Sequence, residues 1–111
     1  MNKELLLNLK FKSKTIKING EEWEVRELSA GDSSEYQSSL YKIVNGKPIP
    51  NLKDATLKLV LLTLFKNNEK VFGKNDLQLI KDRMPASIVN EIATVATELN
   101  GLNDSEENEK N

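Results

Sequence analysis

The chain contains no cysteine and no histidine. Without cysteine there is no disulfide framework, no thiolate nucleophile and no zinc knuckle. Without histidine the chain lacks the commonest general base and the commonest transition-metal ligand. Its paired carboxylates lie in turns or in the polar C-terminal tail, where burial will not raise a carboxyl pKa for acid catalysis. We therefore predict a protein that is not an enzyme, with no catalytic, metal-binding or cofactor-binding residues.

A strong charge of either sign and a long apolar run are also missing. The formal net charge of the 111 residues is −1 at pH 7, which gives no overall attraction to nucleic acid or to an anionic membrane. The leucines at positions 5–7 are followed closely by Asn8 and Lys10, whereas a secretory signal needs roughly 7–15 apolar residues. We therefore expect a protein of the cytoplasm with no membrane partner.

The length predicts one domain, residues 1–102, followed by a disordered, polar and acidic tail at 103–111 that has no apolar residue. Residues 1–20 carry five lysines and one glutamate, whereas the tail carries four acidic residues and one lysine. Such a chain could bind a second copy head to tail, or the two charged ends could simply be solvated.

The most apolar segment is 52–65, and we expect it to be the most buried element. Its apolar residues recur at the spacing of one helical face: Leu57, Val60, Leu61, Leu64 and Phe65. The segment is too short to cross a bilayer, which takes roughly 20 apolar residues. A helix this apolar must be covered by its neighbours, so the remaining elements are expected to pack around it.

Residues of about 14–28 predict a β-hairpin around the turn dipeptide Asn19-Gly20. With a loop of residues 19–22, Ile18 would face Trp23 and Ile16 would face Val25, which puts all four on one side. A lone hairpin is marginal in water, so this apolar side should pack on the helices. Trp23 could instead be a binding aromatic, but its phase with the other three favours the core.

The other segments predict helices. Residues 2–9 could form a short helix or, since apolar residues alternate there, a strand. Ser29 and Asp32 form a capping box for a helix ending near residue 44, and residues 45–51 are expected to be a linker. A short helix should begin after Asn75, and Pro85 and Gly101 should bound the last one. The predicted fold is therefore mainly α, a compact bundle of about four helices with the N-terminal hairpin packed on it.

The order of the segments carries a resemblance. A leucine-rich start precedes the strand and turn KTIKING, the junction WEVRELSAGD and the leucine-rich helix, and then come VFGKND, LIKDRMP and IVNEIATVATELN. Over about residues 3–102 this order resembles the tail assembly chaperones of long-tailed bacteriophages and prophages. The resemblance implies a small non-enzymatic protein of the host cytoplasm, inclined to self-associate and absent from the mature virion. Its implied partners are the tape-measure protein, which it binds during tail assembly, and the major tail protein, which it helps recruit.

The family has no catalytic residue and no sharp binding motif to carry over, so the candidate contact residues rest on exposure and apolarity. We predict partner binding through Leu5, Leu6, Leu9, Val95 and Leu99. The competing role for all five is ordinary core packing.

Two other functions stay open at this point. One is a structural component of a phage or prophage tail. The other is a small nucleic-acid-binding regulator that uses the N-terminal lysines, which are interleaved with Phe11: Lys10, Lys12, Lys14 and Lys17. Hairpin glutamates can neutralise these lysines, so the leading hypothesis includes no nucleic-acid partner.

Overall fold

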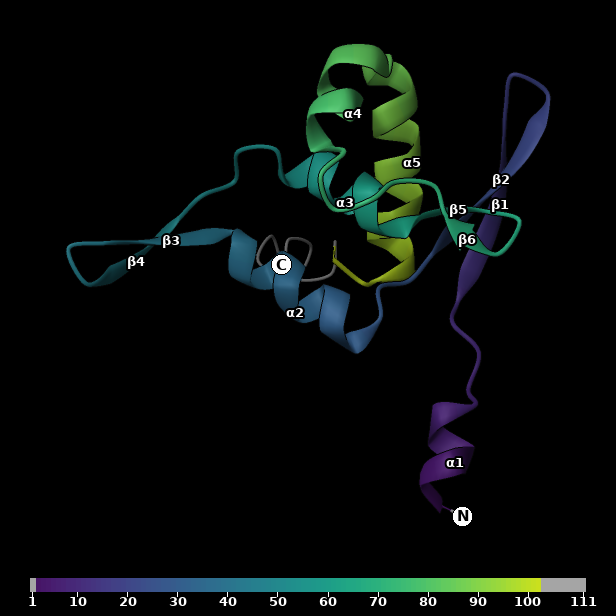
Figure 1. Cartoon of the computed structure of the whole chain (residues 1–111), viewed down its shortest axis with the longest axis horizontal. Coiled ribbons are helices and arrows are strands. Elements are labelled where there is room, and N and C mark those ends of the chain that lie inside the picture. Colours follow the sequence, from purple (N-terminus) through teal and green to yellow (C-terminus); the bar gives the residue numbers. More distant parts are fainter. Residues whose placement is uncertain (1, 103–111) are drawn as a thin grey trace, which may run out of the picture.

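The computed structural model describes residues 2–102, and in this part helices and strands are mixed (Figure 1). The helices are α1 (Asn2–Leu7), α2 (Ala30–Ser39), α3 (Ala55–Thr63), α4 (Leu77–Arg83) and α5 (Ala86–Leu99). The strands are β1 (Ser13–Ile18), β2 (Glu21–Arg26), β3 (Tyr41–Val44), β4 (Lys47–Pro50), β5 (Leu64–Lys66) and β6 (Glu69–Lys70). With 46% helix and 25% strand, the prediction of a mainly α fold is wrong. The predicted tail at 103–111 lies outside the described residues.

The core lies where α5 packs between the sheet and α3. The antiparallel sheet has the strand order β1-β2-β5-β6, and α5 contacts β1, β2 and α3. Val25 of the sheet, Val60 of α3 and Ile92 of α5 are each fully shielded from solvent. Through α5, the N-terminal hairpin and α3 therefore share one core.

The N-terminal hairpin is confirmed, with a register that differs from the expected one by two residues. Ile16 lies opposite Trp23, and Ile18 lies opposite Glu21. Asn19 and Gly20 both have positive φ, 54° and 82°, and form a two-residue turn instead of the expected four-residue loop. Because side chains alternate with a period of two, this shift leaves the same apolar residues on the face that meets α5.

The expected helix 29–44 ends early, and the expected linker is a second hairpin. Residues 41–44 form β3 and pair with β4 around Asn45-Gly46, where φ is again positive at both residues, 53° and 77°. At the end of α2, the Ser39 hydroxyl donates to the Tyr36 carbonyl at 2.6 Å, a bond typical of serines that compete with the helix. Aromatic and β-branched residues then favour a strand.

A third two-residue turn explains the polar segment after α3. Asn67 and Asn68 both have positive φ, 52° and 70°, and connect β5 to β6. The helix predicted over 52–65 is therefore shorter at both ends, since Leu64 and Phe65 belong to β5. Within α3 the buried residues are Leu59, Val60, Leu61 and Thr63.

The end of α5 follows the sequence pattern closely. Gly101 has φ of 66°, its N–H donates to the Glu98 carbonyl at 3.2 Å, and the Leu102 N–H donates to the Thr97 carbonyl at 3.0 Å. These two bonds make a Schellman motif, as the glycine predicted. At the other end Pro85 occupies the residue just before the first helical turn.

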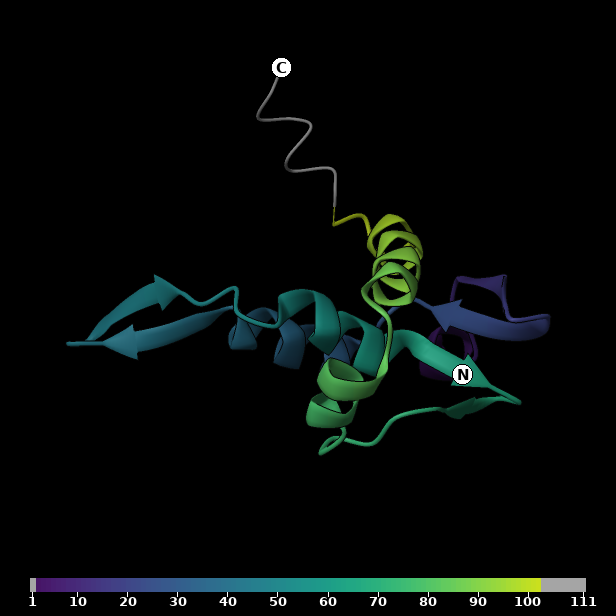
Figure 2. The same cartoon turned by 90° about the horizontal axis from the view of Figure 1, so that it is seen from above.

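The molecule is more extended than the predicted compact bundle. The radius of gyration is 15.5 Å, whereas a compact domain of this length has about 13 Å. Two segments project from the body: α1 beyond one end of the N-terminal hairpin, and β3–β4 on the other side (Figures 1 and 2). Every residue of β3 and β4 is exposed, and α1 buries none.

The start of α2 gives a first stability prediction. The Ser29 hydroxyl accepts a hydrogen bond from the Asp32 N–H at 3.1 Å, as the capping box predicted. We expect Ser29→Ala to lower the free energy of unfolding by about 1 kcal/mol. Ser29→Asp, which retains an acceptor, should stay within a few tenths of that of the unmodified protein. Urea denaturation measures both, and equal stability of the alanine variant would contradict the cap.

Candidate protein-interaction surfaces

Within residues 2–102, no group of three or more carboxylate, thiol or imidazole side chains comes together to hold a metal ion. Over the same residues, no helix is both long enough and apolar enough to cross a bilayer. The features that stand out are apolar side chains outside the core, gathered on two projecting segments.

The first is the N-terminal arm, residues 2–11. Its large apolar side chains are mostly solvent-exposed: Leu5 72%, Leu6 69%, Leu7 78%, Leu9 66% and Phe11 50%. A six-residue helix is too short to be stable alone in water, and this one has no buried residue. Monomeric proteins rarely leave such a contiguous apolar patch open, so the arm has the character of an interaction segment.

The arm is joined to the body at a fixed point. The Lys12 N–H donates to Glu27 Oε1 at 2.7 Å, and the Glu27 N–H donates to the Lys12 carbonyl at 2.9 Å. Both backbone groups of Lys12 are therefore tied to the end of β2. This directs the preceding residues away from the turn at Asn19-Gly20 (Figure 1).

The second segment is the hairpin arm, residues 41–50. Its register places Tyr41 opposite Pro50 and Ile43 opposite Pro48, so one face of the arm is apolar throughout. Tyr41 is 57% exposed and Ile43 is 70% exposed. This surface was missed from the sequence because α2 was expected to continue to about residue 44 and residues 45–51 to be a linker, although Asn45-Gly46 is the same turn signal that located the N-terminal hairpin.

The prolines decide how the hairpin arm can meet a partner. Pro48 and Pro50 lie on β4 at positions whose nitrogens face away from β3, since the pairs next to them carry the ladder hydrogen bonds. Proline has no N–H, so the free edge of β4 cannot pair with another strand through these residues. The surfaces left for docking are the apolar face and the edge of β3.

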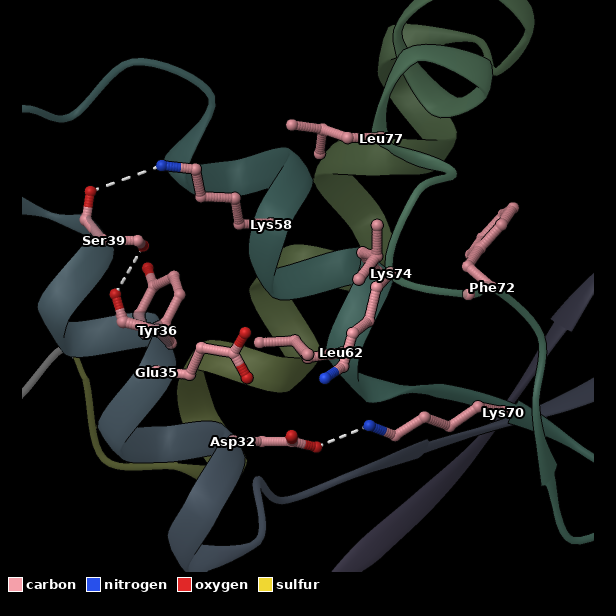
Figure 3. Close-up of a pocket in the computed structure, with 12 residues that line it drawn as sticks. Asp32, Glu35, Tyr36, Ser39, Lys58, Leu62, Lys70, Phe72, Lys74 and Leu77 are labelled. Carbon is pink, nitrogen blue, oxygen red and sulfur yellow. Dashed lines mark hydrogen bonds and ion pairs between the residues drawn. The ribbon is translucent and has the colours of Figure 1, made fainter.

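A groove of about 400 Å³ lies between α2, α3 and the segment 70–77 (Figure 3). Asp32 and Lys70 form an ion pair across it at 2.6 Å, and Lys58 Nζ donates to the Ser39 carbonyl at 3.3 Å. Burial in the same region raises the pKa of Tyr36 above its usual range. These polar contacts tie α2 to the body.

Comparison with protein-family models and with curated proteins gives no match. Among solved structures, that of the bacteriophage HK97 tail assembly chaperone superposes with a TM-score of 0.63. The superposition covers 88% of this chain and 96% of that one, at 16% sequence identity. The chain has the fold of a phage tail assembly chaperone. The resemblance drawn from the order of the sequence segments is thereby confirmed at the level of fold.

Within this tail-chaperone fold the predicted contact residues fall into two groups. Leu5, Leu6 and Leu9 lie together on the exposed N-terminal arm. Val95 and Leu99 lie on α5 and pack, partly buried, against the core. The structure therefore does not bring the five residues onto one surface, and the position of Val95 and Leu99 matches the competing role of core packing.

Two of the N-terminal lysines lie on opposite faces of β1. Lys14 lies on the same face of β1 as Ile16, whereas Lys17 lies on the opposite face, directly across from Glu22.

Proposed function

We propose that this protein is a non-enzymatic tail assembly chaperone that binds the tape-measure protein while a long phage tail is assembled. The observation that carries the proposal is the N-terminal arm, whose leucines are 66–78% exposed beside a body that has its own core. The fold shared with the HK97 tail assembly chaperone supports it. In the same role the protein helps recruit the major tail protein.

The physical task suits the two arms. A long helical client exposes apolar stripes before it is packed into a tail. Covering these stripes lowers the free energy by roughly 25 cal/mol for each Å² of apolar surface buried. The N-terminal arm can complete its helix against such a stripe, because a segment that orders on binding adapts to several sites. The hairpin arm offers a stiffer surface, since two of the four residues on its apolar face are prolines.

The proposal also states where and when the protein acts. The chaperone acts in the host cytoplasm, associates with further copies of itself and leaves before the tail is complete. It is therefore absent from the mature virion. Recovery of this chain from purified virions at structural copy number would favour a tail component instead.

Co-expression with the tape-measure protein of the same phage or prophage tests the function. We expect most of the tape-measure protein to stay soluble with the intact chain and to precipitate without it. A triple variant, Leu5→Ser, Leu6→Ser and Leu9→Ser, should lose most of this protection because its arm no longer presents apolar side chains. Leu52→Ser is the matched control, since Leu52 is 68% exposed but lies outside both arms. A tape-measure protein that is equally soluble with and without the chain would contradict the proposal.

A further inference from the structure

The hairpin arm leaves the outer edge of β3 open. Its two-residue turn makes Val44 and Lys47 a hydrogen-bonded pair, and pairs of this kind alternate along an antiparallel ladder. Lys42 and Val44 therefore bond to β4, whereas the N–H and C=O groups of Tyr41 and Ile43 point away from it. In the described part of the chain, no other element bonds to these outward groups. The edge of β3 thus presents two donors and two acceptors to an incoming strand.

The opposite edge of the arm, that of β4, differs in kind. Its outward nitrogens belong to Pro48 and Pro50, which have no N–H. A strand that joins a sheet exchanges both N–H and C=O bonds with the edge, so only the edge of β3 is suitable. The arm also stands clear of the body in both views (Figures 1 and 2). A lone two-stranded hairpin is marginal in water, and a third strand on the β3 side would stabilise it.

The side chains beside the edge define which strand fits. Tyr41 and Ile43 lie on the apolar face of the arm, whereas Lys42 and Lys47 lie on the other face. Residues 36–53 contain three lysines and no acidic residue. Within the described chain none of these lysines outside α3 forms an ion pair. A complementary strand therefore has an acidic residue opposite Lys42, between two apolar residues opposite Tyr41 and Ile43.

Two other occupants fit this edge poorly. If two copies paired through the outward groups of Tyr41 and Ile43, Lys42 of one copy would lie directly opposite Lys42 of the other. Like charges in that position are destabilising, and lysine on an exposed strand opposes pairing between copies. The acidic residues 103–111 have the right charge but contain no apolar residue to flank it. The edge therefore favours a segment of a different protein.

We propose that the edge of β3 binds the client by strand addition. An extended client segment, with one acidic residue between two apolar ones, becomes the third strand of the hairpin arm. Tyr41 and Ile43 exchange main-chain hydrogen bonds with it, and Lys42 faces its carboxylate. The main-chain bonds accept any extended segment, and the alternating side chains select the acidic one. The proposed function enters only as the source of the segment, and the pairing chemistry is independent of it.

A peptide probe tests the pairing without the client. The probe is a blocked heptapeptide in which valine and glutamate alternate, and in its control lysine replaces glutamate. Titrated into the isotope-labelled full chain, the acidic peptide should move the amide proton signals of Tyr41 and Ile43 downfield as their hydrogen bonds form. At low salt it should bind at least about fivefold tighter than the basic peptide. Equal affinity of the two peptides, or signal changes confined to residues outside 41–50, would overturn the proposal.

Ile43→Pro removes one outward N–H from the edge and leaves the ladder intact. Pro48, directly opposite, already occupies the equivalent position on β4, so the backbone there accommodates proline. Ile43→Val is the matched control, because it keeps the N–H with a side chain of similar size. The proline variant should bind the acidic peptide at least about fivefold more weakly, since a peptide carbonyl loses its donor. The valine variant should stay within about twofold.

The amide signals of Lys42 and Val44, which bond to β4, report whether the hairpin arm survives in both variants. We expect them to stay in place, and the melting temperature to be unchanged, because Ile43 is exposed. Equal affinity of the proline and valine variants for the acidic peptide would show that the edge of β3 is not the binding site.

The same variants, titrated with the tape-measure protein, separate the pairing from the function. We expect the proline variant to bind this client at least about fivefold more weakly than the valine variant. Client binding that is equally strong for both variants would overturn strand addition and leave the chaperone function standing. A client that binds neither variant nor the unmodified chain would overturn the proposed function, and with it the client as the source of the strand.

Discussion

Ile92→Ala is expected to lower the free energy of unfolding by about 3–5 kcal/mol. Ile92 is completely shielded from solvent and belongs to α5, the helix that contacts both the sheet and α3. Removing three carbons there leaves a cavity that rigid neighbours on two sides cannot close. A small domain is stable by only about 5–15 kcal/mol, so the loss is a large part of the total.

Ile43→Ala provides the matched control, because the same atoms are removed from a side chain that is 70% exposed. Surface changes of this kind usually stay within about 0.5 kcal/mol. Urea denaturation of both variants measures the difference directly. Equal destabilisation would mean that the hairpin arm is packed in solution, and the separation of core from arms would then be wrong.

The second large effect concerns binding. We expect Tyr41→Ser combined with Ile43→Ser to weaken binding of the tape-measure protein by at least about tenfold, because buried aromatic anchors dominate such interfaces. The melting temperature should stay nearly constant, since both side chains lie on the exposed apolar face of the hairpin arm. Titration of the client measures the first quantity, and thermal denaturation measures the second.

Lys42→Ser with Val44→Ser is the control for this pair, since these residues lie on the opposite face of the same strand. It should leave affinity within about threefold, as substitutions outside the buried centre of an interface do. If the two double variants weaken binding alike, the hairpin arm has no preferred face. If neither does, the N-terminal arm acts without it.

The two hairpins show where reading the sequence succeeds and where it fails. Around Asn19-Gly20 the flanking residues alternate cleanly between apolar and charged, so only a strand pattern fits. Around Asn45-Gly46 the same turn signal was set aside, because Tyr36, Leu40 and Ile43 also fit a helical period. Short apolar segments satisfy both periods, and the positive φ at Asn45 and Gly46 decides for the strand.

The candidate site was predicted in part for a physical reason. The leucines of residues 2–9 lie in a segment too short to fold alone, so the length predicts that it docks on the body or on a partner. In the structure these leucines are exposed. Val95 and Leu99 continue the apolar stripe of α5, and the structure places them against the core. The apolar face of the hairpin arm depends on the strand register, which brings Tyr41 beside Pro50 from nine positions away. Local spacing carries no information about such a pair until the turn is located.

Trp23 was interpreted as a core residue, and the structure gives it a double character. Its ring shares the face of Ile16 and Val25, which are both buried, but it is itself only partly covered. The unpaired indole nitrogen distinguishes it from them. Sequence periodicity reports the face on which a side chain lies and says nothing of the acceptor that its N–H needs.

The central claim is that binding takes place on arms outside the core, and hydrogen exchange of the complex with the tape-measure protein tests it most directly. The account predicts that amides in residues 2–11 and 41–50 gain protection on binding, while those of α3 and α5 exchange as in the free protein. Protection confined to the polar face of α5 or to the groove beside α2, with both arms unchanged, would contradict it.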